Sequence, residues 1–97
     1  MYVVSLSYTA PLNRIDELVP AHIAWLQAAY RDGLLLASGR KLPRTGGVIL
    51  ARRMPREQLD ALLAQDPFRQ AGVAEYSITE FAPSMSAPEL AQLLEPN

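Results

Sequence analysis

The residue whose type most directly suggests chemistry is His22, the single histidine of the 97-residue chain. A histidine exchanges protons near neutral pH, because its unperturbed pKa is about 6.5. His22 lies in residues 19–26 (VPAHIAWL), beside apolar residues that recur at helical spacing. We therefore treat it as a candidate general acid or general base. The alternative interpretation is an ordinary, partly buried histidine on a helix.

The carboxylate that could orient His22 is Asp66. A carboxylate beside an imidazole fixes its tautomer and stabilises its protonated form. Asp66 opens residues 66–68 (DPF), directly after a predicted helix whose end we expect to lie near the helix that carries His22. The alternative is a capping role, because an aspartate before proline often accepts hydrogen bonds from nearby backbone N–H groups.

Composition excludes several other classes of function. The chain has no cysteine, which removes disulfides, thiolate catalysis and thiolate metal sites. One histidine and scattered carboxylates form no ligand set, and no phosphate loop or cofactor motif is present, so we expect no metal and no cofactor. The net charge of −1 offers no broad basic surface for nucleic acid or an anionic membrane. Without a membrane-length apolar run or a signal-peptide pattern, the expected compartment is the cytoplasm.

The first helical region decides where His22 lies. It follows a predicted strand over residues 2–8, and Asn13 is its expected cap. Pro20 removes an internal hydrogen bond, so we expect a kink or break near Val19 and a main helix from about residue 21 to 31. His22 would then lie in the first turn of that helix, where the dipole favours a neutral imidazole.

The remaining elements are predicted from apolar periodicity and from turn residues. Strands are expected over residues 34–41, 48–52 and 73–81, and a second amphipathic helix over 54–65 that ends at Asp66. Gly39 marks a bulge or a close backbone approach near the end of the second strand. The composition shifts after Pro83, which divides a domain of residues 1–83 from a tail of residues 84–97. In that tail, Ser86 has capping-box spacing to Glu89 and predicts a short helix.

The order strand, helix, strand, strand, helix, strand predicts an α+β fold of the ferredoxin-like βαββαβ type. Such a fold has a four-stranded antiparallel sheet with two helices on one face. The strands are apolar on both alternating faces, so a single chain would leave an apolar sheet face uncovered. We therefore expect these faces to pack together in a homodimer or higher homo-oligomer.

Three segments together resemble the YciI-like (YCII-related) family. They are residues 20–26 (PAHIAWL), 33–39 (GLLLASG) and 66–73 (DPF followed by AGV), and the resemblance spans about residues 1–81. It implies a dimeric α+β barrel of two ferredoxin-like units and a His–Asp active site, to which His22 and Asp66 correspond. Ser38 falls where family members often carry a small or hydroxyl residue, which makes it a candidate for substrate binding. Family members often have a proline after the glycine that corresponds to Gly39, and this chain has Arg40 there. If the Arg40 side chain faces the pocket, it would bind an anionic group; if it faces water, it would only be solvated.

The resemblance also implies a class of reaction. One characterised branch of the family is a dehydrochlorinase that acts on a chlorinated hydroxyquinol. By that likeness, this chain would catalyse acid–base elimination or isomerisation of a small organic molecule without a cofactor. The alternative is a noncatalytic module for small-molecule binding or dimerisation, whose ligand binding would survive replacement of His22. A third option is a haem- or oxygen-related member of the wider barrel superfamily, which an absorbance spectrum would reveal.

Overall fold

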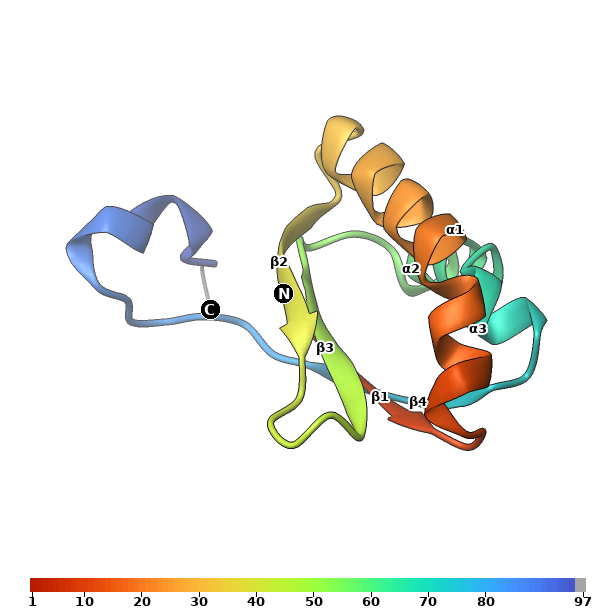
Figure 1. The fold of residues 1–97 in the computed structure, drawn as a ribbon. Helices are drawn as coiled ribbons and strands as arrows, with labels where there is room; N and C mark the ends of the chain where they lie inside the picture. Colours follow the sequence, from red (N-terminus) through yellow and green to blue (C-terminus); the bar gives the residue numbers. More distant parts are fainter. Residues whose placement is uncertain (96–97) are drawn as a thin grey trace.

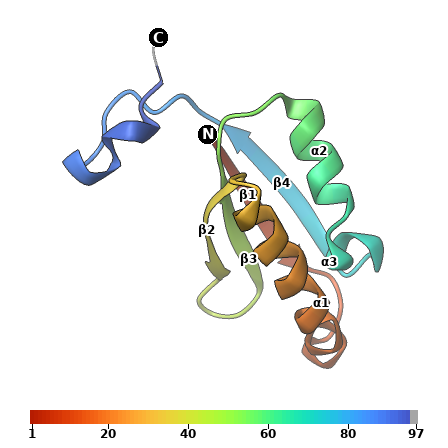
Figure 2. The same ribbon diagram turned by 90° about the horizontal axis from the view of Figure 1, so that it is seen from above.

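A four-stranded antiparallel sheet carries the α-helices of this chain on one face (Figures 1 and 2). The computed structural model describes residues 1–95. The strands are β1 (Tyr2–Tyr8), β2 (Leu35–Arg40), β3 (Gly46–Ala51) and β4 (Ala74–Glu80), in the order β2-β3-β1-β4. The helices are α1 (Leu12–Arg31), α2 (Arg56–Ala64), α3 (Pro67–Gln70) and the 3₁₀ helix η1 (Pro88–Leu93). This is the ferredoxin-like arrangement, so the predicted fold class is confirmed.

The core lies between the sheet and its helices. Tyr2, Val4 and Leu6 alternate along β1 and are almost fully buried, so they mark the face that the helices cover. Ile49 lies directly opposite Val4 on β3 and shares that face. Burying an aliphatic side chain of this size contributes roughly 1.5–3 kcal/mol, so this small set holds the helices against the sheet. The Tyr2 hydroxyl donates a hydrogen bond of 2.8 Å to the carbonyl of Met54 and is thereby satisfied.

Helix α1 is continuous through Pro20, so the predicted break near Val19 is wrong. Two buried residues of the helix, Ile15 and Ala29, lie on either side of the proline and hold both halves against the sheet. Packing of this kind outweighs a local preference against proline. The helix follows Pro11, which is extended and provides no side-chain cap; Asn13 is therefore inside the helix and is not its cap.

The continuity of α1 also moves His22. It lies about three turns after the first residue of the helix, and not in a first turn. The dipole acts mainly within the first and last turns, so the expected preference for neutral imidazole loses its basis.

Other boundaries differ in detail from those predicted. Helix α2 starts after Pro55 and is shorter than residues 54–65. The irregularity in β2 falls between Leu35 and Ala37, so no bulge lies at Gly39. A Cβ added at Gly39 would meet nothing within 4 Å, so the alternative, a close approach that requires glycine, is wrong as well. Strand β3 begins at Gly46, where an added Cβ would lie 1.7 Å from the backbone oxygen of Leu6. Only glycine fits there, because β1 and β3 approach each other closely.

The C-terminal tail extends from β4 on the side of the sheet away from α1 (Figure 1). The predicted short helix exists as η1, but its cap position is Ala87, which makes no side-chain cap; Ser86 is not the cap. Glu95 accepts a hydrogen bond of 2.7 Å from the N-terminal ammonium of Met1 and joins the two ends of the described chain. Residues 96–97 of the predicted tail lie outside the described residues. Within residues 1–95, no helix is long and apolar enough to cross a membrane.

Candidate functional site

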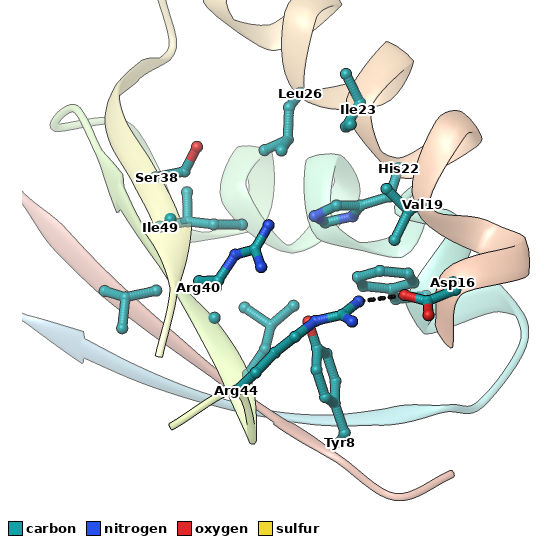
Figure 3. A pocket seen from close by; sticks show the side chains of 15 residues that line it. Tyr8, Asp16, Val19, His22, Ile23, Leu26, Ser38, Arg40, Arg44 and Ile49 are labelled. Atoms are coloured by element: carbon teal, nitrogen blue, oxygen red, sulfur yellow. Dashed lines mark hydrogen bonds and ion pairs between the residues drawn. The ribbon is translucent and has the colours of Figure 1, made fainter. Parts of the chain in front are cut away.

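A pocket of about 390 Å³ opens between α1 and the helix-covered face of the sheet (Figure 3). Its walls are mostly apolar, with a few polar and charged groups among them, which is the usual composition of a small-molecule site. The polar or charged side chains at its walls are those of Tyr8, Asp16, His22, Ser38, Arg40 and Arg44.

His22 and Asp66 meet at the wall of this pocket although 44 positions separate them in the sequence. The distance from His22 Nδ1 to Asp66 Oδ1 is 2.7 Å. The His22 side chain is 14% exposed and lines the pocket, whereas Asp66 is fully buried behind it. An ionised carboxylate only accepts hydrogen bonds, so Nδ1–H donates, and in the neutral imidazole the lone pair is then on Nε2. The geometry thus suits a base at Nε2.

Asp66 is the buried centre of a small hydrogen-bond network. Besides His22, its Oδ1 accepts a hydrogen bond of 3.0 Å from the backbone N–H of Phe68, and this contact caps α3. Its Oδ2 accepts a hydrogen bond from the hydroxyl of Tyr76. Burying a carboxylate is costly unless its oxygens are satisfied, and both oxygens have donors here. The cap and the histidine contact, considered as alternatives from the sequence, therefore coexist.

Tyr76 belongs to this network, although the sequence analysis did not single it out as a site residue. Burial, followed by the hydrogen bond to Asp66, raises the pKa of its phenol well above the ordinary 10.0. Because the folded-state pKa is raised, the protonated phenol stabilises the folded chain fully below pH 10. That contribution is lost as the pH rises through the folded-state pKa. Tyr76 is therefore a constant donor to Asp66 at neutral pH.

Two aromatic side chains fix the plane of the His22 ring. Phe68 stacks on it with ring centroids 4.0 Å apart and an angle of 12° between the planes. Trp25, one turn later on α1, lies at 5.7 Å with an angle of 30°. Trp25 is itself held by a hydrogen bond of 3.1 Å from its Nε1 to the carbonyl of Leu62. With Nδ1 also bonded, the ring has little freedom to turn.

The other two predicted site residues line the same pocket from β2. Ser38 Oγ lies 2.7 Å from the hydroxyl of Tyr30, and Arg40 is exposed at the pocket wall. Sequence reasoning missed Arg44 and Asp16, whose side chains pair across the pocket at 2.5 Å. Asp16 could have been considered as a site residue from the sequence, because it lies on the same helix as His22.

The hydrogen bond from Arg44 to Asp16 raises the pKa of Arg44, which therefore stays charged. Among residues 1–95, no group of three or more histidine, cysteine or carboxylate side chains is placed to hold a metal ion.

Comparison with solved structures finds a 5-chloro-2-hydroxyhydroquinone dehydrochlorinase from Burkholderia phenoliruptrix AC1100, in complex with 2,5-dihydroxybenzoquinone. It is 18% identical, the match covers 84% of this chain and 93% of that chain, and the TM-score is 0.65. At this identity the likeness supports the fold. Comparison with curated proteins finds no match. The family model of the YCII-related domain matches residues 1–82, so the chain belongs to the YCII-related family.

Proposed function

We propose that this protein is a cofactor-free enzyme that uses His22 and Asp66 for acid–base elimination or isomerisation of a small organic molecule. The observation that carries the proposal is the 2.7 Å contact between His22 Nδ1 and the buried Asp66, at the wall of a pocket of about 390 Å³. The dehydrochlorinase with the same fold was solved with a single-ring quinone, and a molecule of that size suits this pocket.

The reaction begins with proton transfer to His22. Nε2 takes a proton from a carbon made acidic by a neighbouring carbonyl, and the imidazolium so formed is stabilised by Asp66. In an elimination, the C–H electrons form a C=C bond while the bond to chloride breaks on the adjacent carbon. In an isomerisation, the same proton returns at another carbon. A positioned histidine contributes about 10²–10⁴ in rate to such steps.

A substrate panel tests the proposal directly. The untagged chain is incubated in D₂O with small cyclic enols and ketones and with a chlorinated hydroxyhydroquinone. Chloride release and loss of acidic C–H signals in proton NMR spectra are then measured. We expect turnover or exchange above the buffer rate for at least one ring compound. Rates equal to buffer across the panel would favour the alternative, a noncatalytic binding module.

The sheet face opposite α1 supports a homodimer as part of the proposal. Val3 and Leu50 lie directly opposite each other in the register and alternate with residues buried under the helices, so they share the uncovered face. Val48 lies on the same face, beside the polar residues Ser5, Ser77 and Thr79, so the apolar part of this face is a strip of Val3, Val48 and Leu50. A second copy that covers this strip would remove it from water. We expect sedimentation equilibrium at micromolar concentration to give the mass of two chains.

A charge placed on that face should break the dimer. Leu50→Glu would bury an unpaired carboxylate between the two sheets and shift the equilibrium to monomer by at least tenfold. The exposed Gln27 of α1 provides a matched control, Gln27→Glu, which should sediment like the wild type. A wild-type chain that sediments as a monomer would contradict the prediction.

A further inference from the structure

Arg40 is placed by the sheet register on the same face as the pocket. It lies directly opposite Gly47 on β3, two residues after Ser38, so both side chains point to the helix-covered face. Gly47 has no side chain on that face, and both Arg40 and Gly47 line the pocket. Figure 3 shows the guanidinium group turned toward His22, across the pocket from α1.

The charged side chains around the pocket differ in whether they have a partner of opposite charge. The carboxylate of Asp16 is the partner of Arg44, and this ion pair is neutral as a unit. Within the described part of the chain, no carboxylate lies within 4.0 Å of the Arg40 guanidinium. The Arg40 charge therefore faces a largely apolar pocket with no counterion among residues 1–95. A guanidinium offers a planar fork of donors that fits a planar, delocalised oxyanion.

We propose that Arg40 is the anion-binding residue of this pocket and that its ligand is a small organic molecule carrying a carboxylate or a ring phenolate. The inference rests on the proposed function and names the substrate class for the same site. The oxyanion lies against Arg40, and the carbon skeleton spans the apolar pocket toward His22. Negative charge that develops when Nε2 removes a proton then spreads toward Arg40, where the guanidinium stabilises it.

Because His22 is the only histidine, its Cε1–H signal in the proton NMR spectrum of the untagged chain reports occupancy of the pocket. The probes are benzoate against neutral benzamide, and 4-nitrophenolate against neutral 4-nitroanisole. We expect saturable shifts with at least one anion and at least tenfold weaker binding of its neutral counterpart. The responding anion distinguishes a carboxylate from a phenolate.

Variants assign the effect to Arg40. Arg40→Gln should weaken binding of the anion at least tenfold, whereas Arg31→Gln, at the exposed end of α1 and outside the pocket lining, should not. Circular dichroism spectra establish that both variants are folded. Equal affinity of the wild type and Arg40→Gln for the anion, or equal affinity for anionic and neutral probes, would overturn the inference.

The proposed enzyme activity and the proposed anion site at Arg40 can be contradicted independently of each other. Calorimetry of His22→Asn with the same anion measures binding without the base, and we expect wild-type affinity within about threefold. Binding through Arg40 without turnover of any panel substrate would support the anion site and contradict the proposed enzyme. Turnover that needs His22 but is unchanged in Arg40→Gln would support the enzyme and overturn the anion site.

Discussion

Replacing His22 by asparagine should lower turnover by about 10²–10⁴ while leaving the protein folded, because it removes the proton-transferring Nε2. The asparagine amide can still donate to Asp66 from near the position of His22 Nδ1, where the distance is now 2.7 Å. Steady-state rates on a substrate found in the panel, together with thermal unfolding, measure the two effects. A rate within threefold of the wild type would show that His22 has a structural role only.

The alanine variant separates chemistry from stability at the same position. His22→Ala also removes Nε2, so its rate should fall as far as that of His22→Asn. It loses in addition the donor to Asp66 and the stacking on Phe68 at 4.0 Å, so we expect a further stability loss of about 1–3 kcal/mol. In a domain of this size that loss lowers the melting temperature by roughly 5–15 °C. Gln27→Asn, on the exposed side of the same helix, should change neither quantity.

The order of elements could be predicted because apolar periodicity is local and strong in this chain. Strand β1 was predicted from its β-branched, aromatic and apolar residues, and helix α2 from the apolar stripe that contains Leu59 and Leu63, both of which are buried. The prediction that failed was the break in the first helix near Val19, which followed from the local effect of Pro20. That effect describes an isolated helix, and packing of the residues before and after the proline decides the outcome here.

Part of the candidate site could be predicted from local features of the sequence. His22 stood out by residue type, and Asp66 by the DPF boundary that caps α3. Tyr76 could not be separated from other strand aromatics, because only the fold brings its hydroxyl to Asp66. The same holds for Arg44, which lies in a turn and meets Asp16 through tertiary structure alone.

Replacing Asp66 should have the largest combined effect on stability and activity. Asp66→Ala leaves three donors, on His22, Phe68 and Tyr76, without their acceptor. Buried donors without partners cost about 1–3 kcal/mol each, and water can reach the partly exposed His22, so we expect a loss on the order of 3–5 kcal/mol. Urea unfolding monitored by circular dichroism measures this loss, with the unfolding free energy taken by linear extrapolation.

The asparagine variant isolates the charge of Asp66 from its shape. In Asp66→Asn, the amide oxygen can still accept from His22 and cap α3, and the NH₂ group can donate to the Tyr76 oxygen. The fold should therefore persist, but no negative charge stabilises the imidazolium, so turnover should fall by about 10²–10⁴. Tyr76→Phe removes only one donor, and we expect a smaller rate loss and about 1 kcal/mol of stability. If Asp66→Asn turned over like the wild type, the carboxylate would be no more than the cap of α3, because an uncharged acceptor of the same shape would then do all that the site requires.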